Sequence, residues 1–184
     1  MKPGFIQTYS GKLFYPLDPD PELIVVDDIA HGLANQCRFA GQAVRRYYSV
    51  AEHSYHVSRI CLEEDALWGL LHDAAEAYLG DLPRPLKHAS TLGPSYRRAE
   101  AKLMRAICER FDLPAREPKS VDTADAAMLL AEQRDLVGEP ACGWDEWLHG
   151  APRVEPAAIN VSSSLGPAES ESVYLRRFYE LGGR

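Results

Sequence analysis

The sequence has 184 residues, with 20 Lys and Arg against 27 Asp and Glu, so its formal net charge is 20 − 27 = −7. This length predicts one domain over residues 1–184, because domains typically contain about 100–150 residues. The acidic balance argues against a duplex nucleic acid partner, which needs a basic face, and the apolar runs are too short to span a membrane. No signal-peptide pattern is present and the four cysteines are widely spaced, which predicts a cytoplasmic protein.

The chain begins with two β-prone runs around Ser10 and Gly11, within residues 5–15, which predict a small hairpin. Everything after the prolines at 16, 19 and 21 has the pattern of helices separated by Pro and Gly. The predicted fold class is therefore all-α with a small N-terminal β-hairpin. We expect the hairpin and a lead-in over 1–27, the main helices over 28–137, and a loop with a C-terminal helix over 138–184.

The helices are predicted from apolar spacing and from their start and stop signals. Ser49 followed by Glu52 fits a capping box, in which the two side chains satisfy free N–H groups at a helix start. A weakly patterned segment over 138–167, rich in Pro and Gly, is predicted to be a long surface loop. The predicted helices cover 28–36, 50–61, 65–78, 96–111, 120–136 and 168–181.

Several ionisable residues occur where these helices are otherwise apolar. His53 lies between Val50 and Val57 on an apolar face, and on its own it could be an ordinary hydrogen-bonded core histidine. A second group of ionisable residues follows Leu71, and Asp125 is likewise an ionisable residue in an apolar segment, near Met128. Burying such groups is costly unless something pairs them, and a divalent cation would do so. The second group is His72, Asp73 and Glu76.

Two imidazoles and two carboxylates, from His53, His72, Asp73 and Asp125, form a mixed nitrogen and oxygen ligand set. Such a set suits one divalent metal ion, such as Mn, Co, Fe, Ni, Zn or Mg, and leaves positions open for water and substrate. The sequence therefore predicts one metal ion per chain, whose identity the ligand types leave open.

The order His53, His72-Asp73, Asp125 resembles the H…HD…D signature of the HD-domain metal-dependent phosphohydrolases. The similarity extends, over about residues 28 to 136, to the 5′-deoxynucleotidase branch of that superfamily, which predicts an HD-domain helical bundle. Five separate blocks in the same order carry it: 37–39 (CRF), 50–54 (VAEHS), 71–76 (LHDAAE), 80–87 (GDLPRPLK) and 124–126 (ADA).

This resemblance implies a role for each matching residue. The four ligands named above would hold the metal, and Glu76 would orient or deprotonate the attacking water or protonate the leaving oxygen. Arg38 would bind the substrate phosphate, for which a guanidinium is well suited, and Asp81 would accept a hydrogen bond from the sugar 3′-hydroxyl. The branch usually has a Trp after the arginine, which excludes a ribose 2′-hydroxyl; Phe39 occupies that place here.

Structural alternatives exist for several of these residues. Glu76 could pair with Arg84 or Lys87 at a helix end, and Arg38 could pair with Glu52 at the surface. Asp81 could only form local hydrogen bonds within its turn.

The roles of two further histidines are not decided by the sequence. His31 would face the pocket if one helix spanned it and Arg38, although a capping or core role is favoured. His56 could contribute to a second metal, which no further histidine-rich set supports.

The resemblance implies a metal-dependent phosphohydrolase that converts nucleoside 5′-monophosphates, deoxy forms favoured, to nucleoside and phosphate. The alternative is a deoxynucleoside triphosphate triphosphohydrolase, in which extra basic residues would hold the outer phosphates. A catalytically inactive nucleotide-binding module is a third interpretation. The expected partner is a small-molecule nucleotide, and the branch suggests a homodimer. The basic candidates are Arg45, Arg46, Arg84, Lys87, Arg97 and Arg98.

Overall fold

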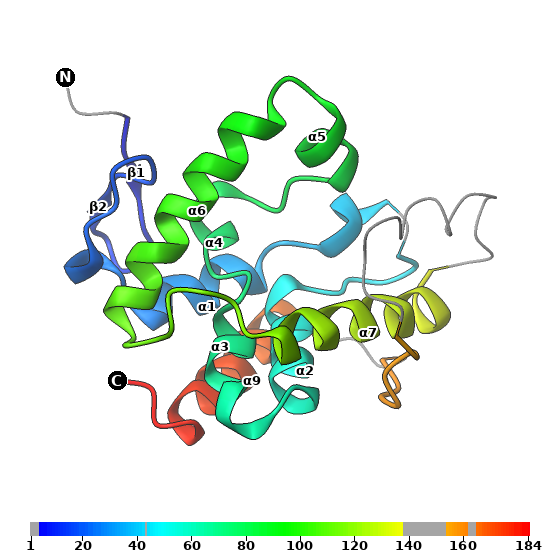
Figure 1. The fold of residues 1–184 in the computed structure, drawn as a ribbon. Helices are drawn as coiled ribbons and strands as arrows, with labels where there is room; N and C mark the ends of the chain where they lie inside the picture. The colour runs from blue at the N-terminus through cyan, green and yellow to red at the C-terminus, as the bar shows by residue number, and fades with distance from the viewer. Residues whose placement is uncertain (1–3, 43, 138–153, 162–164) are drawn as a thin grey trace.

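The computed structural model describes residues 4–42, 44–137, 154–161 and 165–184 of the chain. It confirms the predicted fold class, because helices dominate and the described strands form a single two-stranded antiparallel hairpin (Figure 1). Among the described helices, none is both long enough and apolar enough to cross a membrane.

The hairpin pairs β1 (Ile6–Gln7) with β2 (Leu13–Phe14) in antiparallel register. It is attached to the first helix through Asp28, whose carboxylate accepts the Ser10 N–H at 2.6 Å and the Ser10 hydroxyl at 2.9 Å. Phe14 is fully buried and extends the hairpin into the core. These contacts give the hairpin a fixed position on the helical body.

Each of the six predicted helices has a counterpart among the described residues, with most ends within two or three residues, but the described α-helices number eight. Short 3₁₀ helices cover Pro21–Leu23, Arg38–Gly41 and Glu63–Asp65. The main helices are α1 (Val26–Ala34), α2 (Val50–Ile60), α3 (Ala66–Leu71), α4 (Glu76–Leu79), α5 (Arg84–Ala89), α6 (Gly93–Arg110), α7 (Lys119–Asp135) and α9 (Pro167–Glu180).

Helix α2 lies at the centre of the structure. It packs against α3, α9, α7 and α1, as Figure 1 shows. One apolar cluster joins α1, α3, α6 and α9, and a second joins α2, α3 and α7 around Tyr48 and Met128. Helix α2 therefore presents side chains to both α3 and α7, which is where the candidate ligands occur.

The predicted continuous helix over 65–78 is wrong. Helix α3 ends at Leu71, residues 72–75 form a turn, and α4 begins at Glu76. In the turn, the Ala74 N–H donates to the Leu71 carbonyl and the Glu76 N–H to the Asp73 carbonyl, both at 2.9 Å. These three-residue steps are those of a 3₁₀ helix, which rotates about 120° per residue. The straight-helix geometry assumed for this segment is thus replaced by a tighter turn that carries two candidate ligands.

Helix α5 lies outside the predicted helices, because Pro83 and Pro85 are local signals that stop a helix. Pro85 lies in the first turn of α5, where a missing N–H costs nothing and the fixed φ suits a helix. The predicted loop over 138–167 falls largely on 138–153 and 162–164, outside the described residues. Its described residues 154–161 form no helix or strand, but Ala157 and Val161 are buried against the α7 cluster rather than exposed, and its last residue, Pro167, begins α9.

The segment after Arg38 has an unusual backbone. Phe39 (φ 56°) and Ala40 (φ 53°) are both left-handed, a conformation that costs a residue with a side chain roughly 1–2 kcal/mol. Glycine avoids this cost but loses more entropy on folding. We therefore expect Ala40→Gly to raise the free energy of unfolding by about 0.5–1 kcal/mol in urea titrations. Ala101→Gly, in the middle of α6, should lower the free energy of unfolding by about 1 kcal/mol. If both substitutions lowered it, the expected backbone strain at Ala40 would be contradicted.

Candidate metal centre

Close packing of α2 against α3 brings two histidines together. A side chain at Gly69 would meet the Cys61 sulfur at 2.8 Å and the Ser58 Cα at 3.3 Å, so a larger residue would force these neighbours to shift. One turn after Gly69 is His72, whose Nε2 lies 3.3 Å from the Nε2 of His53 on α2. The sequence separates these residues by nineteen positions, and the helix packing joins them.

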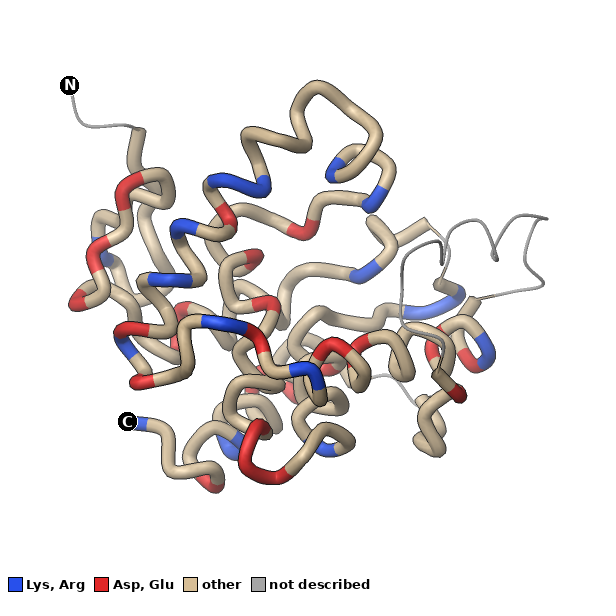
Figure 2. Tube along the Cα trace, in the orientation of Figure 1, with Lys and Arg blue, Asp and Glu red and all other residues tan. Residues whose placement is uncertain are grey.

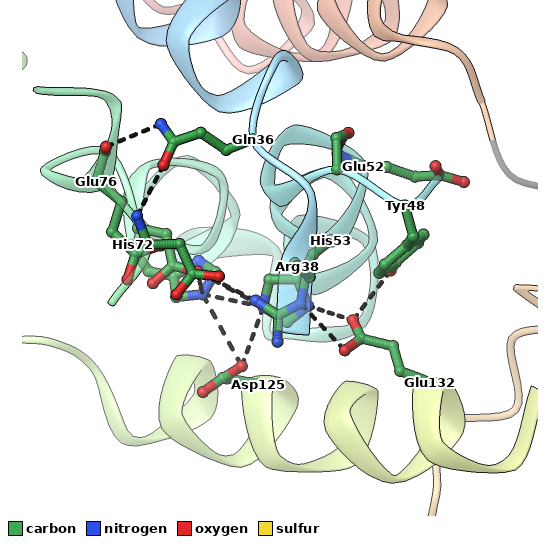
Figure 3. Close-up of polar contacts among 12 residues, drawn as sticks. Gln36, Arg38, Tyr48, Glu52, His53, His72, Glu76, Asp125 and Glu132 are labelled. Atoms are coloured by element: carbon green, nitrogen blue, oxygen red, sulfur yellow. Dashed lines mark hydrogen bonds and ion pairs between the residues drawn. The ribbon is translucent and has the colours of Figure 1, made fainter. Parts of the chain in front are cut away.

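Three of the four predicted ligands form a compact group. Donor atoms of His53, His72 and Asp73 all lie within 4.8 Å of one another, so this group could hold a metal ion. Asp125 of α7 approaches from the other side, with its Oδ1 3.0 Å from His53 Nε2 and 4.0 Å from His72 Nε2. All four predicted ligands therefore meet at one place, and Figure 3 labels His53, His72 and Asp125 there.

The hydrogen bonds of the two imidazoles fit a metal ion. His53 contacts Glu132 through Nδ1 at 2.5 Å, and His72 contacts the Gly69 carbonyl through Nδ1 at 2.8 Å. Metal-binding histidines are usually oriented in this way, with the second nitrogen donating to a carboxylate or a carbonyl. Both Nε2 atoms then face each other and two carboxylates, and each can supply a lone pair to a cation that replaces its proton. The donor chemistry therefore suits a divalent cation placed among them.

The charges of the group point the same way. Burial disfavours protonation of His72, but Asp73 and Asp125 outweigh it and raise the pKa of this imidazole to about 10. Burial also disfavours ionisation of Asp73, yet His72, His53 and Arg38 hold its pKa below the usual range. A pair of ionised carboxylates thus favours positive charge at this spot, which a metal ion would supply.

Arg38 lies across this group, and its partners are Glu132 and Asp73 rather than Glu52, the partner in the structural alternative. Its Nε donates to Glu132 Oε2 at 3.2 Å, and its Nη1 lies 3.6 Å from Asp73 Oδ2. The side chain is only 14% exposed. Phe39 follows directly, with its ring 5.6 Å from the Arg38 guanidinium carbon. Arg38 therefore lies beside the candidate ligands, and the Phe39 ring lies next to Arg38.

Glu76 and Asp81 reach the site from α4 and the following loop. Gln36 connects them: its amide N–H donates to the Glu76 carbonyl at 2.9 Å, and its carbonyl oxygen accepts the Asp81 N–H at 2.7 Å (Figure 3). Burial, with Asp73 and Asp81 nearby, holds the pKa of Glu76 well above its usual range. Burial likewise raises the pKa of Asp81, against the opposing effect of Arg38.

Lys87 bears out one alternative for Glu76, because its Nζ lies 3.8 Å from Glu76 Oε1. Its Nζ also pairs with the Glu100 carboxylate. A cavity of about 430 Å³ opens beside these residues and extends along α6. Its lining includes His72, Asp73, Glu76, Lys87, Glu100, Met104, Arg105, Cys108, Glu117, Asp122 and Asp125.

Two histidines that were left open lie apart from this group. Helix α1 ends at Ala34, so no single helix spans His31 and Arg38. The His31 ring stacks on Tyr9 with 3.9 Å between centroids, and its Nδ1 contacts Glu171 at 3.0 Å, a structural role that links the hairpin to α9. His56 Nε2 lies 4.0 Å from Glu52, and burial lowers the pKa of His56 to about 4.

One of the two hydrogen bonds of the predicted capping box forms. The Ser49 hydroxyl accepts the Glu52 N–H at 3.0 Å, but the Glu52 carboxylate accepts the N–H of Leu165, before α9. Burial raises the pKa of this carboxyl from 4.5 to about 7. A carboxyl with a raised pKa in the folded state destabilises that state increasingly as the pH rises from about 4.5 through 7.

We therefore expect Glu52→Gln to stabilise the protein at pH 8 and to have little effect at pH 5. Gln keeps an acceptor for the Leu165 N–H and removes the buried charge, which should be worth about 1–2 kcal/mol at pH 8. Urea unfolding at both pH values measures it, with Glu109→Gln on the exposed face of α6 as the baseline. Equal effects of Glu52→Gln at the two pH values would contradict the shifted pKa.

Sequence reasoning missed three residues of the site: Glu132, Tyr48 and Gln36. Glu132 is fully buried, two helical turns after Asp125, and so lies on the same face of α7. A carboxylate at that spacing among buried Ala124, Met128 and Ala131 was the available signal. Tyr48 and Gln36 lie outside the motif blocks, and only their contacts reveal them.

Together, fold and site define a mostly helical protein with a candidate metal centre between α2, α3 and α7. No model of a known protein family matches the sequence. Protein YfdR of Escherichia coli K12 is 40% identical over 178 residues, which are 97% of this chain and 96% of that protein. Protein RCAP_rcc00048 of Rhodobacter capsulatus is 37% identical over 150 residues, 75% of this chain and 76% of that protein. The chain belongs to the same family as these two proteins, both of which are described as uncharacterized.

Proposed function

We propose that this protein is an HD-domain metal-dependent phosphohydrolase that releases phosphate from nucleoside 5′-monophosphates, with deoxy forms favoured. The observation that carries the proposal is the meeting of His53, His72, Asp73 and Asp125 beside the guanidinium of Arg38. A cation site with an adjacent buried arginine is suited to a phosphate group, whose oxygens bind both.

When bound, a divalent metal would act as a Lewis acid on a phosphoryl oxygen and activate a water molecule. Arg38 would bind the equatorial phosphate oxygens and offset the charge that develops on them. As the bond from phosphorus to the 5′-oxygen breaks, Glu76 would donate a proton to that oxygen. The raised pKa of Glu76 supports this acid role, because burial and the neighbouring carboxylates of Asp73 and Asp81 favour the protonated form of this carboxyl. Asp81 would accept from the sugar 3′-hydroxyl.

The charges around the cavity favour a monophosphate over a triphosphate. Six carboxyl side chains line the cavity, against two basic side chains, Lys87 and Arg105. Three of the six, Glu100, Glu117 and Asp122, are neither proposed metal ligands nor the proposed acid. Of the six basic residues that were candidates for holding outer phosphates, Lys87 is the one that lines this cavity, and it is paired with Glu100. Along the chain, acidic and basic segments are interspersed (Figure 2). Outer phosphates would therefore meet repulsion that a single phosphate at Arg38 avoids.

The test is a panel of nucleoside mono- and triphosphates, deoxy and ribo, assayed with Mn, Co, Mg and Zn after removal of bound metal by a chelator. We expect phosphate release from deoxynucleoside monophosphates. Release of intact triphosphate from deoxynucleoside triphosphates would support the alternative activity instead. No turnover with any substrate and metal, combined with tight nucleotide binding, would favour the inactive binding module.

Phe39 is expected to set the preference for deoxyribose. An apolar wall that only fails to pair a hydroxyl discriminates weakly, by about 10²-fold, and ring bulk adds to this. We expect a deoxy-to-ribo ratio of kcat/KM well above one that falls toward one in Phe39→Ala and persists in Phe39→Trp. The ratio is measured with one base and one metal on all three proteins. A ratio that Phe39→Ala leaves untouched would remove Phe39 from substrate recognition.

A further inference from the structure

We propose that Glu132 is a positioning residue that holds both the metal ligand His53 and the phosphate-binding Arg38. Through this shared contact it couples metal binding to phosphate binding. The inference rests on the proposed function for the roles of His53 and Arg38, but it concerns a residue outside the motif that suggested that function.

The contacts of Glu132 are those of a fully paired buried carboxylate. Its side chain has no exposed surface. One oxygen, Oε1, accepts from His53 Nδ1 at 2.5 Å and from the Tyr48 hydroxyl at 3.0 Å, and the other, Oε2, accepts from Arg38 Nε at 3.2 Å (Figure 3). A buried charge is tolerated only when it is paired and hydrogen-bonded in this way.

The contact with His53 decides which ring nitrogen is available. A proton on Nδ1 is donated to Glu132, so Nε2 carries the lone pair and faces His72 and Asp125. Carboxylates that hold a ligating histidine in this way fix its tautomer and its orientation, and their loss typically costs 10–100-fold in metal affinity. Glu132 therefore prepares His53 for the metal without touching the metal itself.

The contact with Arg38 fixes the other half of the site. Glu132 occupies the Nε hydrogen, so the end of the guanidinium is directed toward the metal group, where Nη1 lies 3.6 Å from Asp73 Oδ2. The Arg38 guanidinium is itself a buried charge. Without Glu132 it would lose the carboxylate that fixes the orientation of the guanidinium plane. The terminal nitrogens are thereby held beside the position where a phosphate would meet the metal.

Because one carboxylate holds both groups, its two functions are linked. Any shift of Glu132 displaces a metal ligand and the phosphate clamp together. Coupling between two binding sites is reciprocal, so metal should strengthen phosphate binding by the factor by which phosphate strengthens metal binding. We expect this factor to fall when Glu132 is replaced, which a residue that only supports the fold would not cause.

The experiment compares the wild type with Glu132→Gln and with Glu52→Gln, a second buried glutamate, which contacts Leu165 instead of the site. Calorimetry on chelator-stripped protein measures the Kd of Mn²⁺ alone, and inorganic phosphate is titrated with and without Mn²⁺. We expect Glu132→Gln to raise the Mn²⁺ Kd by about 10–100-fold and to reduce the Mn²⁺-dependent gain in phosphate affinity. Glu52→Gln should leave both within about twofold of wild type.

Two further measurements keep the outcome decisive. Circular dichroism and urea unfolding without metal show whether each variant is folded. Tyr48→Phe removes one donor to Glu132 while His53 and Arg38 remain, and we expect it to weaken Mn²⁺ binding by a few-fold. If Glu132→Gln does not fold, an unchanged Mn²⁺ Kd in Tyr48→Phe overturns the proposal. So does a folded Glu132→Gln with wild-type Mn²⁺ and phosphate binding. Wild-type protein that binds both but hydrolyses no nucleotide would refute the proposed function and leave this inference standing, whereas wild type without Mn²⁺ binding refutes both.

Discussion

Asp125→Ala and His72→Ala are each expected to reduce bound divalent metal from about one ion per chain to nearly none. His72 belongs to the group of candidate donors and Asp125 lies beside it, and a metal site that loses one of four ligands loses most of its affinity. Phosphohydrolase activity should fall by at least about 10³-fold, since the Lewis acid is worth several kcal/mol of transition-state stabilisation. Elemental analysis and kcat measure the two effects.

The matched control is Asp122→Ala, one turn earlier on α7, which also lines the cavity. It should keep its metal. Stability supplies a second readout, because a ligand stabilises only the state that binds it. Added Mn²⁺ should raise the unfolding temperature of wild type and of Asp122→Ala, but not of the two ligand variants. Full metal content in both ligand variants would refute the metal centre.

Glu76→Gln is expected to lower kcat by about 10²–10⁴-fold while the protein keeps its metal. An amide of nearly the same shape cannot deliver a proton to the leaving oxygen, whereas it leaves the ligand group intact. The carboxyl is 8% exposed and touches Lys87, so its replacement is a local change. Steady-state kinetics with a deoxynucleoside monophosphate, together with elemental analysis, separate a lost acid from a lost metal.

Glu100→Gln is the matched control, because Glu100 lines the same cavity and contacts the same lysine. We expect its kcat to stay within about threefold of wild type. A substrate with a better leaving group than a sugar 5′-oxygen, such as an aryl phosphate, should lose less with Glu76→Gln, since it needs less protonation. Equal losses on both substrates would assign Glu76 to the attacking water rather than to the leaving oxygen.

The fold class could be predicted from the sequence because it depends on local patterns. Apolar residues at helical spacing, the Ser49 cap and the prolines determine where helices begin and end, and each signal acts over a few residues. The prediction failed where local signals compete. The turn over 72–75 and helix α5 both contain residues compatible with a helix, and packing decides whether the chain continues or turns.

The candidate ligands could also be chosen from the sequence, since a His or Asp on an apolar helix face is costly without a partner. Only the tertiary structure decided which of these groups meet. His53 and His72 approach because Gly69 allows α2 and α3 to pack closely, and Asp125 arrives on α7, far along the chain. Glu132 joins His53 to Arg38 across 79 and 94 positions. The sequence alone determined the helices and the types of ligand; the contacts between distant residues were decided by packing, because that is a property of the whole core and not of any one segment.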